Sequence, residues 1–154
     1  MRTFHAPASF VRRSALALPL AAAATWLAGC GTRAPAPAPD ANSAAARAYR
    51  QSAARHIYQR HASRIYAGKL PPLLYAIGTL QVTLDSDGGV RRLNWLRAPS
   101  HAPEVVREIE RMVRADAPFP APPGRNGVVW TDTWLWDKSG RFQLDTLTEG
   151  QLQE

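Results

Sequence analysis

The stretch GTLQVTLDSDGGV, residues 78–90, decides the fold. Leu80, Val82 and Leu84 alternate with polar residues, which is the pattern of a β-strand with one buried face. The turn DSDGG follows, and its Asp, Ser and Gly residues tolerate the positive φ angles of a tight reversal. Residues 90–97 then form a second apolar run, so the sequence predicts an antiparallel hairpin.

One helix is predicted on each side of this hairpin. Ser43 can cap a helix that runs to about Ala67, where Gly68 stops it, and apolar or aromatic residues recur every four positions along it. Pro103 suits the first turn of a second helix, which carries one apolar stripe and ends before Pro118.

Two more strands are predicted after the second helix. Val128 to Trp136 is rich in β-branched and aromatic residues, and Arg141 to Leu147 is a plausible fourth strand beyond the turn DKSG. The order α-β-β-α-β, with a possible final β, predicts an α+β fold of two layers. We expect an antiparallel sheet of three to four strands packed by two helices around one core.

The first 29 residues are expected to be a cleaved lipoprotein signal peptide. Arg12 and Arg13 form a positive region, and the apolar run that follows is too short to span a bilayer as a stable anchor. The run ends in LAGC, which resembles the bacterial lipobox, in which the Cys carries lipid after cleavage. Cys30 is thus the expected lipidation site, and the alternative is an ordinary signal peptide with an incidental cysteine.

Residues 30–42 are expected to form a spacer, and residues 43–154 a single domain. The spacer contains RAPAPAPDAN, whose alternating prolines favour a stiff, extended backbone. Cys30 is the only cysteine, so neither a disulfide nor a zinc-binding cysteine set can stabilise the domain. Two or more acyl chains would hold the protein on a membrane. By resemblance to the sorting rule of bacterial lipoproteins, Gly31 in place of Asp favours the outer membrane.

The charge of the chain does not favour a nucleic-acid partner. The net charge of +7 includes three arginines of the signal peptide, and export to the periplasm excludes most nucleic acid. The first helix is nevertheless basic and lies close to the expected anchor. Its arginines are predicted either to face anionic headgroups or to be solvated: Arg47, Arg50, Arg55, Arg60 and Arg64.

No catalytic or metal-binding constellation is predicted. His56 and His61 are five residues apart on the first helix, so they point in different directions, and we expect the first to be solvated and the second to lie at the core margin. His101 lies alone before the second helix, and its neighbour Ser100 lacks the setting of a nucleophile. The glutamates of the second helix are interspersed with arginines, as on a solvated face. We therefore expect no enzyme activity, no metal and no cofactor.

The third predicted strand is unusually rich in tryptophan. Its alternation places Trp130, Asp132, Trp134 and Trp136 on one face. The interpretation that we favour is core packing, because aromatic residues in strands bury large areas. The alternative is an exposed partner-binding platform for an extended peptide or a glycan, with Thr133 on a strand at the sheet edge.

Residues 70–147 resemble the C-terminal domain family of TonB and TolA. The resemblance rests on the alternating strand, the Asp-Gly-Gly-Val turn, the amphipathic helix, the motif Pro118-Phe119-Pro120 and the closing strand. The family couples inner-membrane motors to outer-membrane receptors through a transmembrane helix and a long proline-rich reach. This chain has a lipobox and a short spacer instead, so the resemblance implies the recognition of a partner segment by strand addition rather than motor coupling.

The function expected from the sequence is that of a non-enzymatic envelope adaptor. A lipid anchor at the outer membrane would present the domain to the periplasm, where it binds an extended segment of an unidentified envelope protein. The alternative is an envelope protein that binds or processes peptidoglycan or another glycan, for which the tryptophan-rich strand is the only support.

Overall fold

The computed structural model describes residues 40–153. The predicted signal peptide, Cys30 and most of the spacer lie outside these residues. The helices and strands are α1 (Ala44–Arg60), η1 (Ala62–Arg64), β1 (Ala76–Leu84), β2 (Val90–Arg97), α2 (Pro103–Ala115), β3 (Val128–Trp136), β4 (Phe142–Leu144) and η2 (Asp145–Leu147). No helix within residues 40–153 has the length and apolarity needed to cross a membrane.

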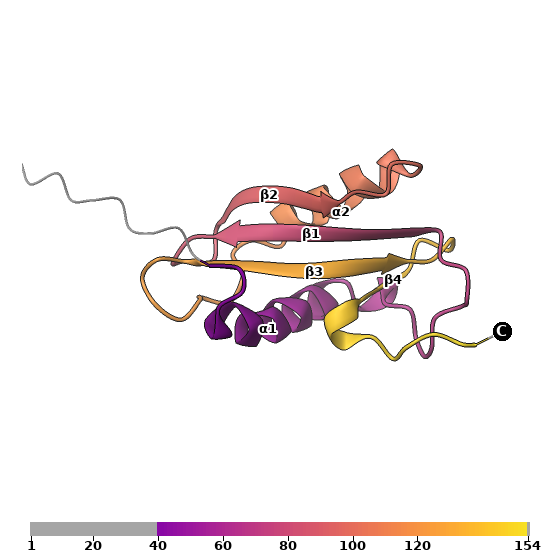
Figure 1. Cartoon of the computed structure of the whole chain (residues 1–154), viewed down its shortest axis with the longest axis horizontal. Helices are drawn as coiled ribbons and strands as arrows, with labels where there is room; N and C mark the ends of the chain where they lie inside the picture. The colour runs from indigo at the N-terminus through magenta and orange to yellow at the C-terminus, as the bar shows by residue number, and fades with distance from the viewer. Residues whose placement is uncertain (1–39, 154) are drawn as a thin grey trace, which may run out of the picture. The chain divides into compact units, whose positions relative to one another are not determined.

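The four strands form one antiparallel sheet in the order β2-β1-β3-β4. The predicted hairpin is present, with Leu80 opposite Trp95 on one side and Asp132 on the other. Figure 1 shows α2 behind β1 and β2, while α1 runs alongside β3. The α+β fold and the predicted element order, including the optional fourth strand, are confirmed.

One face of the sheet forms the core with both helices. Along β1 the buried residues alternate with more exposed ones, as the sequence predicts for a half-buried strand. The core combines Leu80 and Val82 of β1 with Tyr49 of α1 and with Ile109 and Met112 of α2. The opposite sheet face is not covered by α2 and carries threonine, glutamine and asparagine side chains.

The β1–β2 turn is fixed by its own aspartate and by the segment after α2. The Asp85 carboxylate accepts hydrogen bonds from the backbone N–H of Asp87 at 3.0 Å and of Gly89 at 2.7 Å. Gly88 has φ +84°, and its carbonyl accepts the N–H of Phe119 at 2.9 Å. Phe119 is itself 3% exposed, so the Pro-Phe-Pro segment fills the core beneath the turn.

The first helix is shorter than predicted. Ser43 caps it as expected, with its hydroxyl accepting the N–H of Ala46 at 3.0 Å, but α1 ends at Arg60 rather than near Ala67. Beyond a short 3-10 turn the chain becomes extended, and the Tyr66 N–H donates to the Phe142 carbonyl at 3.0 Å. The apolar repeat continues past the helix end because those residues pack beside β4 instead.

The third strand is interior to the sheet only at its last three residues, where β4 pairs with it. β4 pairs with Trp134 to Trp136, and α1 and η2 contact β3 along this side. β4 covers only Phe142–Leu144 of the predicted strand, since the chain turns into η2 immediately afterwards. The tail is ordered as well: the Leu70 N–H donates to Gly150 and the Leu70 carbonyl accepts from Leu152, each at 2.9 Å.

Candidate protein-binding surface

The tryptophans of β3 do not form an exposed platform. Trp130, Trp134 and Trp136 are 1%, 0% and 5% exposed and belong to the core. Trp136 stacks on Phe142 with their ring planes 9° apart and their centroids 5.4 Å apart. The hypothesis that these side chains contact a partner is therefore wrong, and the core-packing interpretation is confirmed. Thr133 is half-buried, with its hydroxyl 3.0 Å from that of Thr79.

Asp132 is buried and has a structural role. Its carboxylate is 1% exposed and accepts hydrogen bonds from Arg50 Nη2 at 3.0 Å and from two backbone N–H groups, those of Thr133 and Thr146. The same Nη2 donates to Asp145 at 3.0 Å. A buried carboxylate needs such compensation, so this cluster joins α1, β3 and η2 and is not available to a partner.

The arginines of α1 do not form a face of free cations. Besides Arg50, the guanidinium of Arg60 lies 2.9 Å from Asp116, and Arg64 pairs with Glu108. Arg47 and Arg55 form no ion pair with any residue in the 40–153 range and donate to Asn42 and Gln51 respectively. Three of the five arginines of the predicted basic face thus connect α1 and η1 to the rest of the domain, which differs from the expectation that all five face headgroups or solvent.

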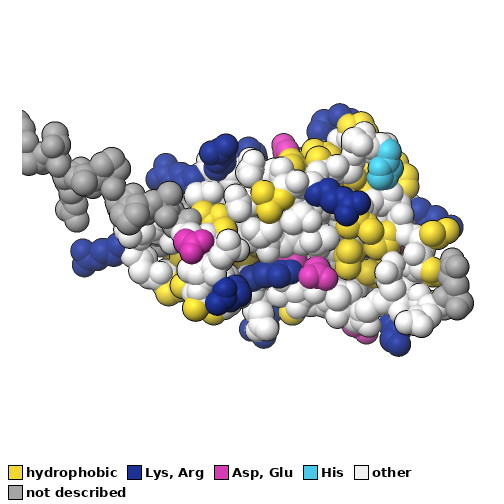
Figure 2. Space-filling model, viewed as in Figure 1, with side chains coloured by type: hydrophobic (Ala, Val, Ile, Leu, Met, Phe, Trp, Pro, Cys, Tyr) yellow, Lys and Arg dark blue, Asp and Glu magenta, His cyan; other side chains and the backbone are white. Residues whose placement is uncertain are grey.

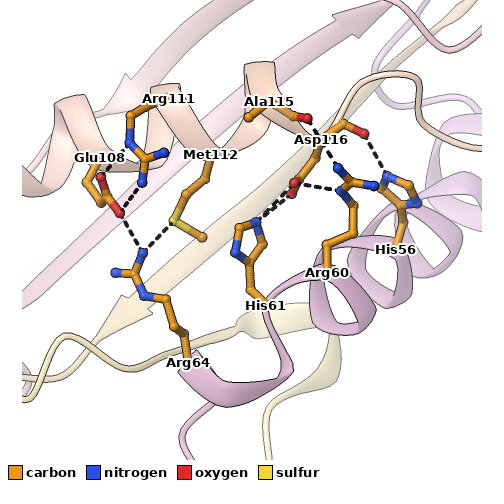
Figure 3. A network of polar contacts seen from close by, with 9 residues as sticks. All are labelled: His56, Arg60, His61, Arg64, Glu108, Arg111, Met112, Ala115 and Asp116. Atoms are coloured by element: carbon orange, nitrogen blue, oxygen red, sulfur yellow. Dashed lines mark hydrogen bonds and ion pairs between the residues drawn. The ribbon is translucent and has the colours of Figure 1, made fainter.

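Figure 3 shows how the end of α1 attaches to α2. His61 Nε2 lies 2.9 Å from one Asp116 carboxylate oxygen and 3.0 Å from the other, so this nitrogen carries the proton. His56 is half-buried, with Nε2 2.8 Å from the Asp116 carbonyl oxygen. The prediction that His56 is solvated is therefore wrong. This geometry anchors two helix ends to each other.

No set of three or more His, Cys, Asp and Glu residues within positions 40–153 is arranged to hold a metal ion. His101, the third histidine that the sequence analysis considered, contacts the Tyr75 carbonyl through Nε2 at 2.8 Å just before α2 begins. It lies apart from His56 and His61, because it packs against the segment that leads into β1.

β2 is the open edge of the sheet. It pairs with β1 on one side, and within the described part of the chain no strand pairs with its other side. α2 supports it from behind, where the Trp95 indole N–H donates to Glu110 at 2.8 Å. An eight-residue strand with one free side presents a row of unpaired N–H and C=O groups, which is a template for an added strand.

The side chains of this edge are basic and apolar. Arg91, Arg92, Leu96 and Arg97 are exposed, and Arg91 pairs with Asp85 at 2.9 Å. Leu96 is 56% exposed and stands at a bulge opposite β1. Figure 2 looks onto the sheet face that α2 does not cover, and Lys and Arg side chains are more widespread on it than Asp and Glu.

A groove runs from Leu96 across this sheet face. Its volume is about 350 Å³, and it crosses the sheet by way of Gln81 and Thr131 to Arg47 and Arg50 at the start of α1. No acidic side chain lines it among the residues that the structure describes. The groove extends the surface of the β2 edge across the sheet.

A second cleft, of about 310 Å³, lies between α2 and the end of β3. Tyr75, Trp136 and Lys138 line it together with Glu104 and Glu108. The Tyr75 hydroxyl holds the pKa of Glu104 below its usual range, and Arg111 and Arg64 lower that of Glu108 to about 2. Glycoside hydrolysis needs one carboxyl group that stays protonated. Neither glutamate meets that requirement at neutral pH.

Sequence reasoning missed the β2 edge. The sequence VRRLNWLR does carry a signal, since three arginines on one short strand are typical of an edge strand rather than an interior one. Strand order was needed to interpret it.

Searches against protein-family models, curated proteins and solved structures found no match.

Proposed function

We propose that this protein is a non-enzymatic adaptor of the bacterial cell envelope. Lipid on Cys30 attaches it to the outer membrane, and its domain faces the periplasm and binds an extended segment of another envelope protein. The open edge of β2 carries this proposal, because it offers backbone hydrogen bonds to an added strand while α2 holds the strand from behind.

Strand addition at the β2 edge is also consistent with the proposed relationship to the TonB and TolA C-terminal domains. Strand addition uses backbone groups, so it places few demands on side chains and needs no catalytic group. A lipid anchor in place of a transmembrane helix leaves recognition without motor coupling. The protein would therefore hold or position its partner rather than transmit force to it.

Photo-crosslinking in native envelopes tests this function. A photoreactive amino acid replaces Leu96 in the full-length lipidated protein, and a control variant carries it at Leu73, which is exposed but lies before β1. We expect one protein adduct from position 96 and none of the same mass from position 73. An absence of protein adducts from position 96 at native expression would refute the adaptor.

Glycan binding remains the second candidate, and one observation favours it. Tyr75, which is 44% exposed, lines the second cleft beside Lys138, and an aromatic side chain with nearby polar groups suits a sugar ring. Titration with soluble peptidoglycan fragments tests it. Binding that Tyr75→Ala abolishes without changing thermal unfolding would favour the glycan over the protein partner.

A further inference from the structure

We propose that the segment added to β2 is acidic, with two carboxylates about four residues apart that pair with Arg92 and Arg97. This inference rests on the proposed function and specifies the chemistry of the partner. It depends on the charge of the edge strand, on the position of its arginines and on the apolar contact between them.

The charge of β2 is one-sided. The strand contains three arginines and no acidic residue. Two acidic residues act on it from neighbouring elements: Asp85 pairs with Arg91, and Glu110 of α2 accepts the Trp95 indole N–H behind the strand. Arg92 and Arg97 are both exposed, and no ion pair forms at either of them within the described residues. A partner strand with acidic residues would supply the missing counter-charges.

The register places the two arginines on the same face. Arg92 lies opposite Thr83 and Arg97 opposite Thr79, two positions of β1 that are four residues apart and point away from the core. The bulge at Leu96 takes up the extra residue of β2. A regular added strand should therefore carry its two carboxylates about four residues apart, or roughly 13 Å along the strand.

Leu96 supplies an apolar contact between these charges. It is exposed at the mouth of the groove that continues over Gln81 and Thr131. The lack of acidic side chains in this groove means that an acidic segment meets no like charge there. An apolar residue of the partner, placed between its two acids, can pack against Leu96 and exclude water from the strand pairing.

Charge reversal during crosslinking tests the inference. The photoreactive group stays at position 96, and the pair Arg92→Glu and Arg97→Glu is compared with Arg55→Glu and Arg125→Glu. The control arginines are also exposed and lie on α1 and on the loop before β3. Both variants reverse two arginines, so they change the net charge equally. Thermal unfolding of each variant checks that the fold is retained.

We expect the Arg92 and Arg97 reversal to lower the adduct yield about tenfold, because two attractive pairs become repulsive. The control pair should leave the yield within about twofold. Mass spectrometry should map the adduct to a segment with two acids about four positions apart. Raising the salt concentration from about 50 mM to about 500 mM should weaken capture by the wild-type protein.

Four results would overturn the inference. An adduct of full yield in the reversed variant would support the adaptor function but contradict the acidic partner. An adduct mapped to a segment without acids would do the same. Equal loss in both variants would mean that net charge, rather than these two arginines, controls capture. An adduct with lipid in place of protein would show that β2 faces the membrane, which contradicts the proposed function too.

Discussion

At the residue scale, Arg50 and Asp132 decide how α1 is fixed to the sheet. The Asp132 carboxylate is buried between two tryptophans, and Arg50 supplies its only side-chain donor among the described residues. Arg50→Ala should therefore destabilise the domain by about 3 kcal/mol, since it leaves a buried carboxylate without a counter-ion and with only two backbone N–H donors. Urea denaturation followed by tryptophan fluorescence measures the change.

Arg55→Ala is the matched control for this substitution. Arg55 lies on the same helix and is exposed, and its side chain bonds to Gln51 at 3.3 Å and to no other residue that the structure describes. We expect a loss of no more than about 0.5 kcal/mol, as for an ordinary surface position. Equal effects of the two substitutions would show that the buried ion pair contributes nothing specific.

The Glu108 carboxylate should make stability depend on pH in the acid range. Arg111 and Arg64 lower its pKa to about 2, below its value in the unfolded chain. A group with a lowered folded-state pKa stabilises above its unfolded pKa, and that stabilisation is lost as the pH falls through the folded value. The free energy of unfolding of the wild type should thus exceed that of Glu108→Gln by about 1 kcal/mol at pH 7. This difference should vanish as the pH falls from about 5 to about 2. A difference that does not change with pH would contradict this.

At the element scale, the β1–β2 turn depends on Gly88 for two reasons that can be separated. Its φ of +84° disfavours any side chain, and an added Cβ would lie 2.0 Å from the Phe119 carbonyl oxygen. Gly140 has φ +79° but nothing within 4 Å of an added Cβ. Gly140→Ala should cost about 1 kcal/mol from backbone strain alone, whereas Gly88→Ala should cost roughly 3 kcal/mol or more. Thermal unfolding distinguishes them, and equal costs would disprove the close packing of the turn on Phe119.

Local patterns predicted most of the elements. The hairpin, α2 and β3 were predictable because alternation, a tight turn and proline each act within a few residues of the chain. The end of α1 was not, since a contact between Tyr66 and Phe142 decides it. The short β4 was only partly predictable for the same reason: its length depends on where η2 must begin to meet Asp132 and Arg50.

At the scale of the whole molecule, the candidate site was less predictable than the fold. The tryptophans of β3 attracted attention because large aromatic residues serve both cores and binding sites, and only burial distinguishes the two. The arginines of β2 went unnoticed because the sequence does not state strand order. Only the tertiary structure shows that β2 is at an edge and that β4 pairs with the end of β3.

The proposed lipid anchor predicts where the protein is found in the cell. Cys30→Ser removes the acceptor thiol, so we expect the protein to lose its metabolic labelling with palmitate and to leave the outer-membrane fraction. Fractionation after labelling measures both changes. An unlabelled wild-type protein, or a substituted protein that remains in the membrane fraction, would contradict the anchor.

Hydrogen exchange of β2 tests the central claim most directly. The lipidated protein is compared in native envelope vesicles, where its partner is present, and after purification in detergent. An added strand should slow the amide exchange of Val90–Arg97 in the vesicles and leave the already paired β1 unchanged. Identical exchange of β2 in both preparations would contradict the account, because no segment could then be paired with the open edge.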